Sequence, residues 1–183
     1  MASIVTNKFI IESCANRLEP NSTIAKSLSR TERSFLKKRE IYETCFSALD
    51  AWITSRLRKK KGADIPNFAT ISWERYEALG GGQRTRPIFL PHPEWTRAHK
   101  ILYMAPVVPP KLARCEEVSY SRLALKHSRA LTKDVVFTGV RDLLRKIGEV
   151  CGAGREVEVR FAFGALRASE RRARFEFAAA ALV

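Results

Sequence analysis

The sequence predicts an α+β protein in which one unit, helices followed by a β-hairpin, is used twice. An amphipathic helix over residues 35–60 precedes an apolar segment over 63–76 and a return strand over 86–90. A second amphipathic helix later in the chain precedes apolar strands over 157–163 and 173–183. A length of 183 residues accommodates two small domains of this kind. We therefore expect two lobes with the same order of elements.

The N-terminal part contains two predicted helices with a loop between them. Residues 4–18 carry apolar side chains at helical spacing, and Pro20 ends the run. Residues 21–35 are rich in Ser, Thr and Arg, which is typical of a loop. The helix over 35–60 ends in a run of cations before Gly62, the usual pattern of a helix C-terminus. Its apolar face consists of Ile41, Cys45, Leu49, Trp52, Ile53 and Leu57.

The first hairpin is predicted to carry only a short arm. Residues 63–76 suit one half-buried strand with a bend at Pro66. The connecting loop over 77–85 contains Gly80-Gly81-Gly82 and a single cation, Arg84. A short helix is expected over 94–103.

The second lobe repeats this plan in a divergent form. A helix over 118–130 is followed by another that Thr132 caps and Gly152 stops. Residues 157–163 alternate apolar with polar or small side chains, which indicates a strand. Residues 167–172 form a tight polar turn, so we expect almost no second arm.

Three prolines mark the boundary between the lobes, and Val107-Val108 among them is expected to pair as an extended edge. We expect the second lobe to lack a closing helix, and its apolar end at Val183 leaves open that the chain is a piece of a longer scaffold. The expected division is an N-terminal helix and loop (1–34), a first domain core (35–104), a Pro-rich connection (105–117) and a second, divergent domain (118–183).

The charge favours an acidic partner. Lys and Arg total 33 against 19 Asp and Glu, a net charge of +14 that is spread over both halves of the chain. Such a field attracts nucleic acid, anionic lipid or an acidic protein surface. No apolar run approaches the roughly 20 residues of a membrane span, and the N-terminus lacks a secretory pattern. We expect no membrane partner.

The four cysteines are far apart in the sequence. They lack the close spacing of zinc or redox motifs, so we interpret them as buried small hydrophobes in a reducing compartment.

The sequence shows none of the usual motifs of metal sites or catalytic sites. His92, His99 and His127 are scattered without ligand-spaced partners, so no metal site is predicted. Nucleophile elbows, phosphate loops and paired carboxylates are absent. We expect a protein that is not an enzyme and needs no cofactor.

The aromatic residues can be interpreted either as part of the hydrophobic core or as a surface on which nucleic-acid bases stack. Trp52 and Trp95 lie on apolar helix faces and are expected in the core. For Trp73 two alternatives stay open, a position in the core or an exposed position on which a base stacks. By strand parity one inner face is predicted to hold Phe161, Phe163, Phe175 and Phe177.

The order helix, turn, long helix, hairpin, short helix resembles the HU/IHF fold of the bacterial histone-like proteins. The residues that carry the resemblance are Gly62, the segment 67–71 and Pro87-Ile88-Phe89, with Phe163-Gly164 in the equivalent place of the second lobe. The chain is also similar to the eukaryotic tandem HU-domain family typified by coiled-coil domain-containing protein 81. That family has a K-G-x-x-I-P-x-F segment followed by R-P-x-F, here residues 61–68 and 86–89.

The resemblance implies a fold and two kinds of function. Bacterial HU dimerises, so two copies in one chain are expected to pair with each other as an intramolecular pseudo-dimer. Bacterial HU and IHF grip DNA with long β-arms tipped by a proline wedge, and that wedge is missing here. Proteins of the tandem family are associated with centrosomes, basal bodies and cilia.

We therefore hold two hypotheses. The first is a structural or interaction protein of a microtubule-based organelle, in the cytoplasm and cytoskeleton at the ciliary axoneme or the basal body and centrosome. It would dock on tubulin or other axonemal and basal-body proteins. The second is an HU-like DNA- or RNA-binding protein.

Basic residues are the candidate partner-binding site for either hypothesis. The cations at the end of the first long helix suit a solvated helix end better than phosphate contacts, which stay the alternative. The candidates are Arg56, Lys59, Lys60, Lys61, Arg84, Arg86, Arg171, Arg172 and Arg174.

Overall fold

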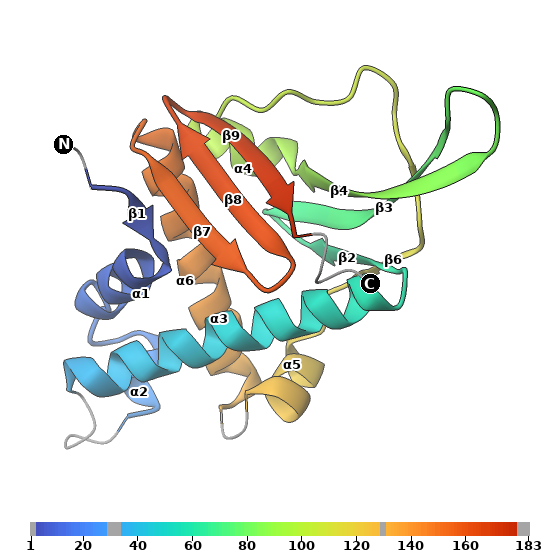
Figure 1. Cartoon of the computed structure of the whole chain (residues 1–183). Coiled ribbons are helices and arrows are strands. Elements are labelled where there is room, and N and C mark those ends of the chain that lie inside the picture. Colours follow the sequence, from blue (N-terminus) through green and yellow to red (C-terminus); the bar gives the residue numbers. More distant parts are fainter. Residues whose placement is uncertain (1–2, 29–33, 129–130, 179–183) are drawn as a thin grey trace.

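Two small sheets and a layer of crossing helices make up the computed structural model, which describes residues 3–28, 34–128 and 131–178 (Figure 1). The first lobe contains β1 (Val5–Thr6), α1 (Asn7–Asn16), α2 (Thr23–Lys26), α3 (Phe35–Arg58), β2 (Gly62–Ile65), β3 (Ala69–Glu77), β4 (Gln83–Pro91) and α4 (Pro93–His99). The connection and the second lobe contain β5 (Lys111–Leu112), β6 (Cys115–Glu117), α5 (Tyr120–His127), α6 (Lys133–Gly152), β7 (Val157–Phe161), β8 (Gly164–Ser169) and β9 (Arg172–Phe177).

The two long helices begin at hydroxyl caps. The Ser34 side chain accepts a hydrogen bond from the Lys37 backbone N–H at 3.3 Å at the start of α3. Thr132 caps α6 in the same way, at 3.4 Å from the Val135 nitrogen, as the sequence predicts. Each helix then runs into the first strand of its hairpin, so the repeated order of elements is confirmed.

The segment over 63–76 is two strands rather than one. Pro66 and Asn67 form a tight turn between β2 and β3, and Asn67 has a left-handed φ of 58°. The Phe68 N–H donates to the Ile65 carbonyl at 3.1 Å across this turn. The bend expected at Pro66 is thus a full reversal of direction, because an Asn readily adopts the left-handed conformation that the turn requires.

The arm of the first hairpin is long, and the prediction of a short arm is wrong. Strands β3 and β4 are nine residues each and pair without a break from Ala69↔Pro91 to Glu77↔Gln83. Figure 1 shows their ends extending away from the helices. The polar residues assigned to the loop over 77–85 continue β4, because side chains on a strand beyond the core are solvated on both faces.

The second hairpin ends abruptly. Strands β8 and β9 are six residues each, and only Glu170 and Arg171 connect them. Both residues have left-handed φ angles, 51° and 65°, as a two-residue hairpin turn requires. The prediction of almost no second arm is confirmed, although most of the predicted turn over 167–172 belongs to the two strands.

The lobes exchange short parallel strands. The N-terminal β1 pairs with β7 of the second lobe, with Val5 opposite Val157. In return β6, which precedes the helices of the second lobe, pairs with β2 of the first, with Ala63 opposite Glu116. Each sheet is therefore completed by the strand that precedes the helices of the other lobe. The helix predicted over 4–18 is shorter, because residue 5 belongs to β1 and α1 begins at Asn7.

One hydrophobic core runs through both lobes. Helices α3 and α6 cross where Gly139 faces Cys45, and a Cβ on that glycine would lie 2.5 Å from the Cys45 sulfur. Helix α4 packs on α6, where the Trp95 indole N–H donates to the Leu144 carbonyl at 3.3 Å. The two sheets meet through stacked rings of Phe89 and Phe175, with centroids 4.9 Å apart. The tandem lobes thus form one packed body.

The aromatic residues left open by the sequence are part of this core. Trp73 is buried, like Trp52 and Trp95, and donates its indole N–H to the Leu57 carbonyl at 2.9 Å. A base-stacking role for Trp73 is therefore wrong. The face expected from strand parity also exists, since the rings of Phe163 and Phe175 stack with centroids 5.3 Å apart.

The connection between the lobes is partly sheet. Its strands form at β5 and β6 rather than at Val107-Val108, whose side chains are exposed. The expected absence of a closing helix concerns residues 179–183, which lie outside the described residues.

Candidate functional site

Basic side chains gather at the end of α3, along the arm and on the β5–β6 connection, and we call this set the basic arm surface. Backbone contacts hold these segments together: the Gly62 N–H donates to the Arg114 carbonyl at 2.9 Å, and Arg75 pairs with Lys111 across β3 and β5. The members that make no ion pair within the described ranges are Arg58, Lys59, Lys61, Arg75, Arg84, Lys111 and Arg114. Their charge is therefore available to a partner.

Two further cations of this surface are engaged locally. The Lys60 ammonium lies 3.7 Å from the centre of the Trp73 ring, a cation–π contact that fixes the end of α3 against β3. Arg86 donates to Glu74 at 2.6 Å and lies over the ring of Tyr76. These contacts position the two side chains and leave the Arg86 side chain 61% exposed.

Arg56 has a structural role instead. Its guanidinium forms an ion pair with Glu116 of β6 at 2.8 Å, and its side chain is only 18% exposed. Arg122 of α5 holds the same carboxylate at 2.9 Å. Arg56 thus ties α3 to the exchanged strand, and we leave it out of the partner-binding set.

Arg171, Arg172 and Arg174 belong to a different face. They lie on the short β8–β9 turn and on β9 of the second sheet. Arg174 is paired with Glu176 at 3.0 Å, and the Arg171 carbonyl accepts from the Leu102 N–H at 2.7 Å. They therefore lie on another sheet than the cations of the arm, and the structure divides the candidate residues between two surfaces.

The tip of the arm is apolar and exposed. Leu79 is fully exposed, and a Cβ built on Gly80, Gly81 or Gly82 would meet no atom of the described residues within 4 Å. All three glycines have φ between +85° and +103°, a range that other residues rarely adopt. The tip therefore presents a leucine on a turn that only glycine tolerates.

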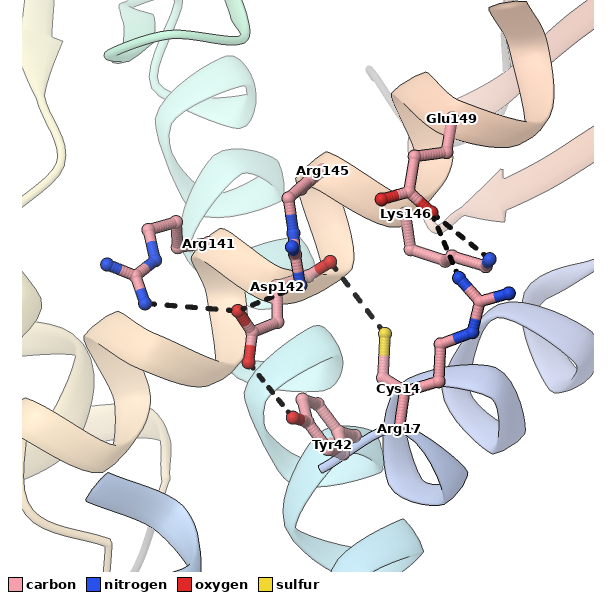
Figure 2. A network of polar contacts seen from close by, with 8 residues as sticks. All are labelled: Cys14, Arg17, Tyr42, Arg141, Asp142, Arg145, Lys146 and Glu149. Carbon is pink, nitrogen blue, oxygen red and sulfur yellow. Dashed lines mark hydrogen bonds and ion pairs between the residues drawn. The ribbon is translucent and has the colours of Figure 1, made fainter. Parts of the chain in front are cut away.

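A second charged cluster, which the sequence did not single out, lies between α1 and α6 (Figure 2). Asp142 accepts a hydrogen bond from the Tyr42 hydroxyl at 3.0 Å, and Lys146 donates to Glu149 at 3.2 Å. Arg17, Arg141 and Arg145 surround these two carboxylates. The helical spacing of Arg141 and Arg145 could have placed them on one face of α6, but no sequence signal brings Arg17 of the first lobe to them.

Two family models match the chain. One, CCDC81 eukaryotic HU domain 1, matches residues 23–103, and the other, CCDC81 eukaryotic HU domain 2, matches residues 114–182. The chain belongs to the eukaryotic tandem HU-domain family typified by CCDC81. No curated protein sequence matches it.

The two CCDC81-type HU domains correspond to the two lobes of the structure. The first match begins at α2 and ends after α4, and the second begins just before β6 and includes β9. Strand β1 and helix α1 precede the first match, and β1 completes the sheet of the second lobe.

Three thiols of this CCDC81-type protein are buried. Burial raises the pKa of Cys45 and Cys151 to about 12. Burial and then the nearby Asp142 carboxylate raise the pKa of Cys14 to about 12 as well. These three cysteines remain protonated near neutral pH and are poor nucleophiles.

The described residues offer no metal centre or membrane segment. They contain no group of three or more His, Cys, Asp and Glu side chains that could hold a metal ion. Within the same ranges, helices with the length and hydropathy of a bilayer span are absent.

Proposed function

We propose that this protein is a non-enzymatic docking module of a microtubule-based organelle, the ciliary axoneme or the basal body and centrosome. It would bind an acidic protein surface, such as tubulin or another axonemal protein, through the basic arm surface. The observation that carries the proposal is the group of arm-surface cations without ion-pair partners among the described residues. The assignment to the organelle rests on the family resemblance.

The polar cluster around His92 does not support catalysis. Its ring nitrogen Nε2 lies 3.0 Å from Asp64 Oδ1 and 3.1 Å from Thr70 Oγ1. Both partners meet the same nitrogen, so the imidazole cannot relay a proton from a hydroxyl to a carboxylate on its other side. Thr70 also donates to Asp64 at 2.6 Å, which makes the cluster a local hydrogen-bond network.

Microtubule co-sedimentation tests the docking proposal. The wild-type chain is expected to pellet with microtubules, less so at high salt because exposed charges are screened. A triple change, Lys59→Ser, Lys61→Ser and Arg84→Ser, should weaken pelleting strongly. The same number of substitutions at Arg97, Arg160 and Arg174, outside the basic arm surface, serves as the control.

Localisation provides the second half of that test. A tagged chain expressed in ciliated cells should concentrate at basal bodies or along axonemes. A diffuse nuclear signal, combined with a chain that does not pellet with microtubules, would contradict the proposal.

Nucleic-acid binding is a second candidate, and the long arm favours it. A hairpin of two nine-residue strands with an exposed apolar tip, Leu79, has the form that architectural proteins use to wedge a base step. The second hairpin offers no matching arm, so a duplex would be held from one side only. For this reason we rank docking on protein first.

A duplex titration separates the two candidates. Nucleic-acid binding predicts a log affinity that falls linearly with log salt, and a Leu79→Ser variant that bends DNA less than the wild type. Absence of any mobility shift at about 50 mM salt, where phosphate contacts are strong, would exclude this candidate.

A further inference from the structure

A polar hollow separates α1 of the first lobe from α6 of the second. Its volume is about 500 Å³, within the range typical of ligand sites. It is lined by residues of α1, α3 and α6, by residues 17–19 just after α1 and by Ser22 just before α2. Figure 2 shows the charged side chains around it, with Arg17 on one side and Arg141 and Arg145 on the other.

The three arginines have hydrogen-bond donors to spare. Arg17 lies 3.6 Å from Glu149, Arg145 lies 3.7 Å from Asp142, and Arg141 lies 4.0 Å from Asp142. These separations are attractive but longer than a hydrogen bond. None of the three guanidinium groups donates a hydrogen bond to a residue of the described ranges. Arg141 also lies over the ring of Phe137, a contact that does not use its N–H groups. The N–H donors of all three arginines can therefore bind an oxyanion.

The two carboxylates hold the cations in place without neutralising them. Tyr42 fixes Asp142 and Lys146 fixes Glu149 through the hydrogen bonds described above. Four cations therefore share these two acids, and Glu19 on the lining is a third acidic group. A net positive charge remains at the hollow. Ser13, Ser22 and Thr138 add hydroxyl groups to its lining.

We propose that this hollow binds a phosphate monoester. A phosphate group has three oxygens that accept hydrogen bonds in parallel and carries about −1.5 to −2 charge near neutral pH. Arginine forks bind such groups in a bidentate manner. Guanidinium groups from two different helices can then each take a separate pair of donors to one tetrahedral anion.

Such a ligand would join the two lobes. Arg17 belongs to the N-terminal lobe, whereas Arg141 and Arg145 belong to the second, so one phosphate would bridge them. A ligand that binds only the folded chain stabilises it by an amount that grows with the ligand concentration relative to Kd. Phosphate is therefore expected to raise the melting temperature as well as to bind.

Calorimetric titration of the full chain at constant ionic strength tests the proposal. The probes are inorganic phosphate, a short phosphoserine peptide and the same peptide without phosphate. The wild type should bind the first two saturably and not the third. Tighter binding of the phosphopeptide than of inorganic phosphate would identify a phosphorylated protein segment as the source, and equal binding would identify a free phosphate.

A double variant, Arg17→Ala with Arg145→Ala, localises the site. Each lost charge-assisted contact should cost about tenfold in affinity, so the pair should bind roughly a hundredfold more weakly. Arg97→Ala on α4 is the matched control, since its side chain is 75% exposed and does not line the hollow. Amide chemical shifts in α1 and α6 should report binding even if the double variant is less stable.

Two results would overturn the proposal. One is the absence of saturable binding by either phosphate probe to the wild type. The other is equal affinity in the wild type and the double variant. Neither result bears on docking through the basic arm surface, because that surface does not include Arg17 or Arg145.

Discussion

The two hairpins of this protein begin alike and end differently. Each starts from a long helix, turns at a buried phenylalanine, Phe68 or Phe163, and sends its inner face into the shared core. The first then continues as nine-residue strands into solvent, whereas the second stops after six residues. The duplicated unit has kept its packing function in both lobes, while only one copy extends beyond the core.

The two hairpins also differ in how many of their charged side chains form ion pairs. On the outer face of the second sheet, Glu158 and Glu176 lie between the three arginines Arg160, Arg167 and Arg174 and pair with all of them. On the basic arm surface, by contrast, seven cations make no ion pair within the described ranges. The second sheet largely neutralises itself, so the arm is the better candidate for meeting an acidic partner.

The largest expected effect tests whether the lobes really share one core. Phe68→Ala and Phe163→Ala each remove a fully buried ring and should each cost about 3–5 kcal/mol of unfolding free energy. All three tryptophans belong to the first lobe. Because the core is continuous, Phe163→Ala in the second lobe should still shift the urea transition followed by tryptophan fluorescence.

The control for that comparison is Leu79→Ala at the arm tip, which should leave the transition within about 0.5 kcal/mol of wild type. If Phe163→Ala altered far-ultraviolet circular dichroism without moving the fluorescence transition, the lobes would be independent domains.

The next effect concerns the crossing of α3 and α6. Gly139→Ala would place a methyl group 2.5 Å from the Cys45 sulfur and should cost about 1–3 kcal/mol by overpacking. Cys45→Ala removes that sulfur, so the double variant should recover part of the loss. A double-mutant cycle from urea melts measures the coupling. Strict additivity of the two changes would argue against this close contact.

A smaller difference is expected between two ion pairs. Glu116→Gln weakens the pair with the poorly exposed Arg56 and should cost about 1–2 kcal/mol. Glu176→Gln acts on a solvated pair and should cost less than about 0.5 kcal/mol. Thermal unfolding of both variants checks the order, and a larger effect for Glu176→Gln would reverse our view of which pair ties the lobes.

The smallest effect is a pH dependence at Asp50. This carboxylate on α3 accepts the Ala162 N–H of the β7–β8 turn at 2.9 Å. Burial raises its pKa above the ordinary 3.8, an effect that the Ala162 and Thr54 hydrogen bonds partly oppose. The folded state therefore binds a proton more readily than the unfolded state just above pH 4.

The sign follows from that difference in proton binding. The contribution of Asp50 to stability grows as pH falls through its raised pKa and declines as pH rises. An Asp50→Asn variant lacks this contribution, so wild type should gain relative to the variant between pH 7 and pH 4. Urea melts at both pH values measure the change, and a constant difference would contradict the assignment.

Local patterns predicted most of the fold. The steps of three and four around Cys45 and Leu49, the hydroxyl cap at Thr132 and the alternation over 157–163 each reflect nearest-neighbour physics that a sequence displays. The arm length was missed because solvated strand residues such as Arg84 and Thr85 have the composition of a loop. Their pairing depends on the partner strand β3 and not on their own hydrophobicity.

The candidate sites were less accessible to the sequence. The sequence shows a basic run such as Lys59-Lys60-Lys61, but it does not show which cations form ion pairs. Arg56, three residues before this run, forms an ion pair with Glu116. Contacts between residues far apart in the chain, such as Arg17 with Glu149, depend on how the helices cross. Such contacts follow from tertiary packing, and the periodicity of apolar residues in one sequence does not predict how its helices pack.

The exchanged strands have a consequence for how the chain is made. During synthesis Val5 emerges from the ribosome long before Val157, its partner in β7. The first lobe likewise waits for β6 before the open edge of β2 is covered. The first sheet is completed only after β6 has been made, and the second sheet pairs β7 with a strand made near the start of the chain. Completion of the two sheets is therefore a late, non-local step of the kind that slows folding. A nascent chain halted after α4 would expose two unpaired strand edges, and it is at this stage that the protein would most need a chaperone.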